Sequence, residues 1–100
     1  QLALKRELEL RGLKVRAKVP VELIYKEIPL GKAYKIDLLV EDKLVIELKS
    51  KFPLPPVDFN QIHTHLSLLN LKHGILINFK VPKMKEGIHR VFNNFGSEEL

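Results

Sequence analysis

Hydrophobic and polar residues follow two different periods in the first quarter of the chain. In residues 2–11, Leu4 and Leu8 recur at the spacing of one helix face, with glutamates on the polar side. Residues 14–25 instead alternate between apolar and mostly charged side chains, which is typical of a half-exposed β-strand. Pro20 lies within this stretch, so the sequence predicts either an edge strand or a strand that is broken in its middle.

Two further strands are predicted next, joined as a hairpin. Proline and glycine predict a connection over residues 29–32. Residues 33–40 and 43–49 then have the composition of strands and are separated by a short acidic turn. Because residues 38–40 and 44–46 are continuously apolar, we expect these two strands to be covered on both faces, in the centre of a sheet.

The second half of the chain predicts a helix, a strand and a less regular end. Prolines exclude a helix from residues 53–56, and residues 57–71 then carry apolar side chains at helical spacing. A glycine ends this helix, and residues 74–79 form an apolar run with the length of a buried strand. Residues 84–95 predict a weaker helical or irregular tail.

The order of these elements, α-β-β-β-α-β, predicts an α/β (α+β) fold. A helix that joins two neighbouring strands has the form of a parallel crossover, so we expect a mixed four-stranded sheet flanked by helices. We expect residues 1–100 to form a single domain. The chain begins at Gln1 inside a helical pattern and without a capping residue, so we also expect part of the N-terminal helix to be missing.

Composition and charge narrow the choice of partners. The net charge of +5 and the isoelectric point of ≈ 9.6 favour polyanions such as DNA or RNA, although a solvated lysine-rich surface would give the same values. The chain has no cysteine, which excludes disulfides and thiolate metal sites and favours an intracellular, cytoplasmic protein. No apolar run approaches the roughly 20 residues of a membrane helix, so we expect no membrane partner.

Acidic residues inside two apolar strands are the most informative feature. Asp37 and Glu47 each lie between two apolar residues, and Lys49 projects from the same strand face as Glu47 because it follows two positions later. A buried carboxylate is costly unless it is paired or bound to a metal. The pattern therefore indicates either a cross-strand ion pair on an exposed sheet face or a cation held by the two carboxylates.

The register of the hairpin decides whether the two carboxylates meet. If the numbers of paired residues sum to 84, Asp37 lies opposite Glu47 and both face the same side. A slip of one residue would place them on opposite faces. A three-residue turn at 41–43 or a bulge near Asp37 would satisfy this requirement, and the sequence does not choose between them.

Asp37, then nine residues, then Glu47-Leu48-Lys49 and a helix with Gln61 together resemble the PD-(D/E)XK nuclease superfamily. More closely, the chain resembles the small GxxExxxY proteins, a branch of that superfamily. The resemblance covers nearly the whole chain. The matching stretches are residues 10–15, 34–42, 44–49, 59–69 and 74–79. A Glu-x-Lys pattern alone is not specific, because residues 41–43 have it too, in the predicted turn.

The resemblance implies a restriction-endonuclease-like core and a metal-dependent hydrolase that acts on DNA or RNA. Asp37 and Glu47 would bind Mg²⁺ or Mn²⁺ as hard oxygen ligands, with the backbone carbonyl of Leu48. Lys49 would orient or activate the attacking water. Gln61 would lie near the same site from the helix, and the metal would polarise the scissile phosphate.

The same resemblance raises two further expectations. The Gly-x-x-Glu motif that gives the branch its name would lie before Gln1. Four residues after Gln61, where the family has tyrosine, this chain has His65, on the same helix face. We expect His65 either to donate a hydrogen bond near the site or to be a half-buried surface histidine. His63 cannot share a helix face with His65, so we expect no zinc site of two histidines.

The residues, together with what the resemblance implies, leave three functional hypotheses. The first is a Mg²⁺-dependent phosphodiesterase, and the second is a catalytically inactive module that binds nucleic acid or mediates assembly. The third is a homodimer that completes its sheet or its site, which the small size favours. A basic group could contact a phosphate backbone, although such groups are more often solvated surface. This group consists of Lys80, Lys83, Lys85 and Arg90.

Overall fold

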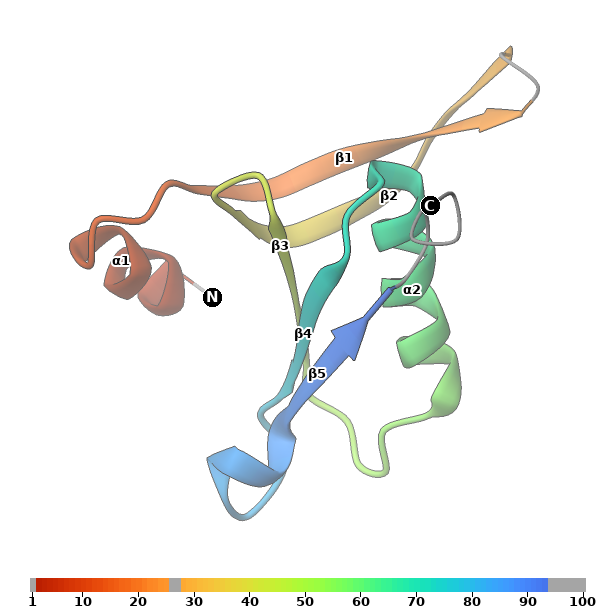
Figure 1. Ribbon diagram of the computed structural model, residues 1–100. Coiled ribbons are helices and arrows are strands. Elements are labelled where there is room, and N and C mark those ends of the chain that lie inside the picture. Colours follow the sequence, from red (N-terminus) through yellow and green to blue (C-terminus); the bar gives the residue numbers. More distant parts are fainter. Residues whose placement is uncertain (1, 26–27, 94–100) are drawn as a thin grey trace.

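The computed structural model describes the backbone of residues 2–25 and 28–93, with the side chains of these residues apart from 22–34. Its elements, in chain order, are α1 (Leu2–Leu10), β1 (Val15–Tyr25), β2 (Ile28–Val40), β3 (Leu44–Lys49), α2 (Pro56–Leu69), β4 (His73–Asn78), the 3₁₀ turn η1 (Met84–Gly87) and β5 (Ile88–Phe92). The strands form a sheet in the order β1-β2-β3-β4-β5 (Figure 1).

The sheet is mixed, as the sequence predicts. Strands β1, β2 and β3 are antiparallel neighbours, β3 and β4 are parallel with α2 as the crossover, and β5 returns antiparallel to β4. The predicted class, a mixed sheet flanked by helices in a restriction-endonuclease-like arrangement, is confirmed. The predicted count of four strands is wrong, because part of the expected tail forms η1 and β5. Only Val91 is buried in β5, so this edge strand has almost no hydrophobic pattern. Residues 94–95 of that tail lie outside the described residues.

A second correction concerns the predicted connection at residues 29–32. Strand β2 runs through it, and β1 and β2 form a long hairpin that projects from the sheet (Figure 1). The pairing of β2 with β3 begins only at Leu38, so the first part of β2 has β1 as its paired neighbour. An edge position tolerates Pro29, since its missing N–H is not needed on the open side. Pro20 also lies in an edge strand, β1, as one of the predicted alternatives requires.

The central strands separate two hydrophobic clusters. Leu39 and Val45 face α2, whereas Leu38, Val40 and Ile46 face the side on which α1 lies. Alternate residues of one apolar run thus enter different clusters, which confirms that these strands are covered on both faces. The α2 cluster contains Val21, Ile36, Leu39, Val45, Ile62, Leu66 and Val91. The α1 cluster contains Val15, Leu38, Val40 and Ile46, with Leu4 and Leu8 packed against it.

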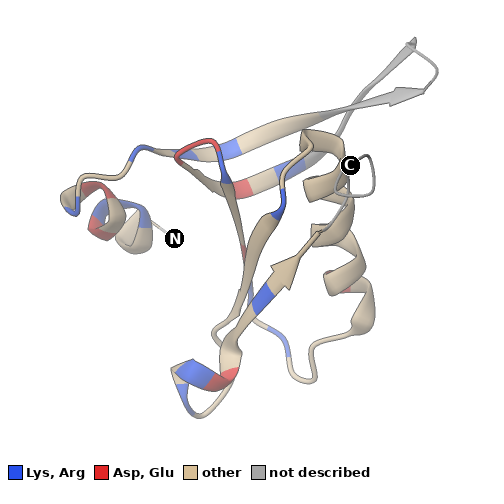
Figure 2. Ribbon diagram, viewed as in Figure 1, with Lys and Arg blue, Asp and Glu red and all other residues tan. Residues whose placement is uncertain are grey.

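The two helices differ in charge and in burial. Helix α1 has no buried residue and carries charged residues of both signs (Figure 2). Lys5 and Glu9 form an ion pair on it. Helix α2 has one acidic residue, Asp58, and buries it together with Ile62, His65 and Leu66. Burying a polar side chain without a hydrogen-bond partner costs free energy, so Asp58 and His65 need partners between α2 and the sheet. The partners of Asp58 and His65 lie on β3 and the residues that follow it.

Candidate functional site

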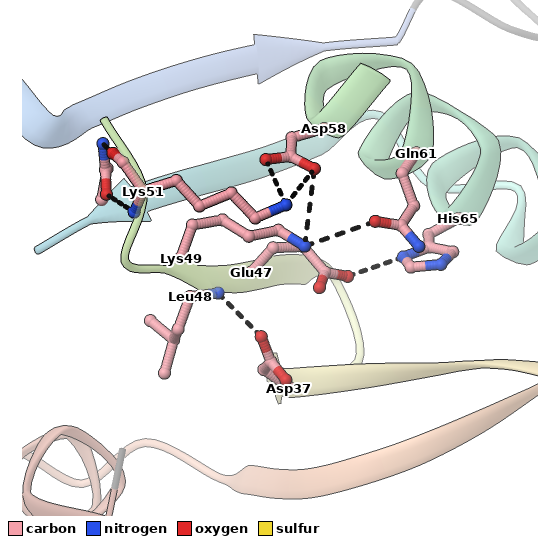
Figure 3. A network of polar contacts seen from close by, with 9 residues as sticks. Asp37, Glu47, Leu48, Lys49, Lys51, Asp58, Gln61 and His65 are labelled. Atoms are coloured by element: carbon pink, nitrogen blue, oxygen red, sulfur yellow. Dashed lines mark hydrogen bonds and ion pairs between the residues drawn. The ribbon is translucent and has the colours of Figure 1, made fainter. Parts of the chain in front are cut away.

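Hydrogen bonds and ion pairs connect β3 and the residues after it to α2. Glu47, Lys49 and Lys51 follow one another at intervals of two and meet residues of α2 (Figure 3). His65 contacts Glu47, Gln61 contacts Lys49, and Asp58 contacts Lys51. Along the network, residue numbers rise from 47 to 51 on the strand side and fall from 65 to 58 on the helix side. The chain therefore runs in opposite directions in β3 and α2.

The spacing of the network follows from the two backbone geometries. Two residues of a strand advance about 6.6 Å, and four residues of a helix advance about 6 Å. The step from Glu47 to Lys49 therefore matches the step from His65 to Gln61. The i, i+4 pair on α2 thus lies above the i, i+2 pair on β3.

Glu47 and His65 form the most buried contact of the network. Glu47 is 5% exposed and His65 is 1% exposed, and Nδ1 of the imidazole lies 2.6 Å from Oε2 of the carboxylate. With its hydrogen on Nδ1, the imidazole donates this bond to the carboxylate oxygen. A charge-assisted bond of this length fixes the orientation of the Glu47 carboxylate. Of the two expectations for His65, the hydrogen-bond donor fits this geometry, and the half-buried surface histidine is wrong.

The two lysines share one buried carboxylate. Both oxygens of Asp58 lie 3.2 Å from Nζ of Lys51, and Oδ1 also lies 3.9 Å from Nζ of Lys49. The Lys49 ammonium donates a 3.3 Å hydrogen bond to Oε1 of Gln61. Lys49 is thus held from two sides by groups of α2. Asp58 is buried in the presence of two cations, which offsets the cost of removing its charge from water.

Asp37 lies where β2 leaves β3. The ladder between these strands ends at the pair Leu38–Ile46, and Oδ2 of Asp37 then accepts a 2.7 Å hydrogen bond from the backbone N–H of Leu48 (Figure 3). The numbers of the paired residues sum to 84 and the turn spans 41–43, as one of the predicted alternatives requires. The side chain of Asp37 therefore takes the place of the next backbone hydrogen bond of the ladder.

The separation of β2 from β3 leaves a hollow with polar groups at its edge. Its volume is ≈ 240 Å³, and Asp37, Leu48, Lys49, Ser50 and Phe79 line it. The carbonyl of Lys49 points to the other neighbour, because it accepts from the N–H of Phe79 at 2.9 Å. Since alternate residues of a strand direct their N–H and C=O groups to opposite neighbours, the Leu48 carbonyl points toward β2 and this hollow.

The oxygen atoms near the hollow match in kind the donors that Mg²⁺ and Mn²⁺ prefer. Asp37 supplies a carboxylate to the hollow and Leu48 a carbonyl, whereas the carboxylate of Glu47 contacts His65 on the α2 side and is not part of the lining. Among the side chains that the structure describes, no three of His, Cys, Asp or Glu are grouped so that they could hold a metal ion. The expected set takes its third protein donor from the backbone, and its role as a metal site stays a prediction.

A family model described as the PD-(D/E)XK nuclease superfamily matches residues 1–91. The chain belongs to this superfamily. A search of curated proteins and a search of solved structures each found no match. Members of the PD-(D/E)XK superfamily generally use divalent metal ions, and their nuclease activity implies a nucleic-acid substrate. No helix in the described part of the chain is long and apolar enough to cross a membrane.

The structure distributes the predicted site residues of this PD-(D/E)XK chain over two connected places. Asp37, Leu48 and Lys49 line the hollow, whereas Gln61 lies on α2, bonded to Lys49. Glu47 projects toward α2 and contacts His65. Their catalytic and metal-binding roles stay predictions. The alternative Glu-x-Lys pattern at 41–43 lies in the turn, as expected.

Sequence reasoning missed Asp58 and Lys51. Asp58 lies in the first turn of α2, where an acidic residue is favourable in any case, so its type and position alone do not single it out. The sequence does contain a signal for Lys51, since it continues the spacing of two residues that relates Glu47 to Lys49. Asp58 precedes Gln61 by three residues and therefore lies on the same helix face.

Proposed function

We propose that this chain is a metal-dependent nuclease that hydrolyses phosphodiester bonds of DNA or RNA, in the GxxExxxY branch of the superfamily. The observation that carries the proposal is the hollow at the divergence of β2 and β3. An acidic side chain, a strand carbonyl and a lysine meet there, and the lysine is held by groups of a helix. The net charge of +5 favours a polyanionic substrate.

Asp37, Glu47 and the carbonyl of Leu48 would hold Mg²⁺ or Mn²⁺. Bound there, the ion would supply Lewis-acid polarisation of the phosphate and lower the pKa of the attacking water. The protein's own task is to hold the two carboxylates in fixed directions. The N–H of Leu48 orients Asp37, and the imidazole of His65 orients Glu47.

Lys49 is the residue for the attacking water and the developing negative charge. Its side chain is mostly buried, and the residue lines the hollow, where the ammonium would meet a phosphate or a water. Gln61 and Asp58 hold that ammonium from α2 and limit the conformations that it must lose when substrate binds. Pre-oriented charges of this kind stabilise charge that develops in a transition state.

The test is cleavage of generic DNA and RNA with Mg²⁺ or Mn²⁺ by the protein and by Glu47→Ala and Lys49→Ala. Loss of a positioned acid–base group lowers the rate by about 10²–10⁴-fold. Lys43→Ala is the matched control, because Lys43 belongs to the Glu-x-Lys pattern of the turn and is exposed. Equal losses from Lys43→Ala and Lys49→Ala would contradict the assignment.

The second candidate is a catalytically inactive module of the same fold that binds nucleic acid or mediates assembly. One observation favours it: an oxygen of Glu47 is already engaged by His65, 2.6 Å away. Calorimetric titration with Mn²⁺ separates the two proposals. Heat of binding that Asp37→Asn removes supports the nuclease, and no Mn²⁺ binding together with no cleavage supports the inactive module. The expected homodimer stays a prediction, and sedimentation analysis would test it by measuring the mass of the protein in solution.

A further inference from the structure

A second hollow adjoins the candidate site and has a different chemical character. Its volume is ≈ 460 Å³, and it is lined by Phe52, Phe79, Lys80, Val81 and Pro82. Phe79 lines both hollows, so the two are contiguous. The described residues around the second hollow include the cation of Lys80 and no carboxylate.

The two phenylalanines are exposed although they are large and apolar. Phe52 is 74% exposed and Phe79 is 47% exposed, and neither belongs to the two hydrophobic clusters of the described residues. A single exposed aromatic residue is ordinary, but two on one hollow form an apolar surface beside a site for a charged substrate. Burial in the core does not account for their positions.

The walls of this hollow are held in place by backbone contacts. Asn78 is buried at the end of β4, donates to the carbonyl of Lys51 at 2.6 Å, and accepts from the Lys51 N–H at 3.1 Å. Phe52 follows Lys51 in the chain, and Phe79 follows Asn78. One buried side chain thus ties together the two segments that carry the phenylalanines, and the Phe79 N–H adds a bond to the Lys49 carbonyl.

Three lysines lie on or near the apolar surface, with the exposed Glu86 in the same segment. Lys80 lines the hollow, and Lys83 and Lys85 are exposed on the segment that leads into and through η1 (Figure 2). Gly87 ends η1 against β4, where an added Cβ would overlap the Asn78 carbonyl oxygen. The basic segment is therefore packed closely against the end of β4 that carries Phe79.

We propose that this hollow binds an unpaired base of a single-stranded nucleic acid, with Phe52 and Phe79 as the stacking surface and Lys80 on the backbone phosphate. The proposal rests on the proposed function, because the adjoining hollow with Asp37 and Lys49 would hold the neighbouring phosphodiester. Aromatic side chains combined with a basic groove are the usual means of binding single strands, since every base offers a π-face. In a duplex those faces are covered by neighbouring base pairs.

The test is fluorescence anisotropy with labelled single-stranded DNA, single-stranded RNA and duplex DNA of one sequence, in EDTA so that no cleavage occurs. Phe52→Leu and Phe79→Leu keep the apolar volume and remove the ring. Stacking is lost in both variants, so we expect affinity for single strands to fall about 5- to 100-fold. The two single-strand probes show whether DNA or RNA is preferred.

Phe92→Leu is the matched control, because Phe92 is 59% exposed and pairs with His73 at the opposite end of β4. A single strand that carries an abasic site opposite the hollow should bind weakly to the protein and be insensitive to Phe79→Leu. Tighter binding of the duplex, or equal effects of Phe92→Leu and Phe79→Leu, would overturn the proposal. Circular dichroism of each variant excludes unfolding as the cause.

The outcomes for base binding and for catalysis are separable. If the protein cleaves nucleic acid with Mg²⁺ while Phe52→Leu and Phe79→Leu bind single strands like the unaltered protein, the stacking surface is wrong and the nuclease stands. If nothing is cleaved but both variants lose affinity for single strands, the nuclease is wrong and the stacking surface stands as part of a binding module.

Discussion

The two halves of β3 differ in how they are paired and in what they bury. Residues 44–46 have ladder partners on both β2 and β4 and are apolar. Residues 47–49 keep their partners on β4, but the ladder to β2 has ended, and an acidic residue and a lysine enter the strand. The same strand is therefore a core element in its first half and the floor of a candidate site in its second.

The comparison shows how a small sheet makes room for chemistry. A backbone N–H that loses its ladder partner needs another acceptor, and Asp37 provides one through its side chain. A carboxylate is thereby fixed at the place where a hollow opens. Helix α2, which packs on one face of the sheet, supplies partners for the side chains of Glu47 and Lys49. The following variants test this difference through the free energy of unfolding, measured by urea denaturation.

The largest loss of stability is expected from Ile46→Ala, in the apolar half. Ile46 is buried in the α1 cluster, and removing such a side chain leaves a cavity that costs about 2–5 kcal/mol. Leu48→Ala is the comparison, because Leu48 faces the same cluster from the second half of the strand and is only half-buried. Equal losses in the two variants would remove the distinction between the halves of β3.

The next largest effect is expected from the Glu47–His65 pair. His65→Leu leaves the Glu47 carboxylate buried without this donor, and Glu47→Leu leaves the imidazole without this acceptor. Each change should cost about 1–3 kcal/mol. The double variant should be more stable than the sum of the two losses predicts, because replacing both partners by apolar groups is nearly neutral. Additive losses would show that the contact contributes nothing of its own.

A smaller effect on stability and a large one on metal binding are expected from Asp37→Asn. The amide oxygen can still accept the Leu48 N–H, so only the difference between a charged and a neutral hydrogen bond is lost, about 1 kcal/mol. The negative charge for a cation is absent, so Mn²⁺ binding in calorimetry should disappear. Asp37→Ala removes the acceptor as well and should be less stable than Asp37→Asn. Retained Mn²⁺ binding in Asp37→Asn would argue against Asp37 as a ligand.

The sequence predicts the second half of β3 better than its surroundings. Asp37, Glu47 and Lys49 are visible because charged residues interrupt apolar runs, and alternation then assigns them to faces. The contact of Lys51 with Asp58 is not visible in this way, because a proline-rich loop separates the two residues and no periodicity encodes its path. The connection predicted at residues 29–32 is wrong because β2 pairs with β1 there. This pairing overrides the local preference of proline and glycine for a loop.

The smallest effect is expected from Asp42, in the turn at residues 41–43 that joins β2 to β3. The Arg16 hydrogen bond, followed by that of Lys14, lowers the pKa of Asp42 below its ordinary value of 3.8. The carboxyl is bound in its ionised form, so its contribution to stability is complete above that value and is lost as the pH falls through the lowered pKa. Asp42 is exposed, so Asp42→Asn should lower the urea midpoint only slightly at neutral pH, and less in high salt. At acid pH, below the pKa of Asp42, the variant and the unaltered protein should have the same midpoint. A difference that persists there would mean that the turn depends on the shape of this side chain and not on its charge.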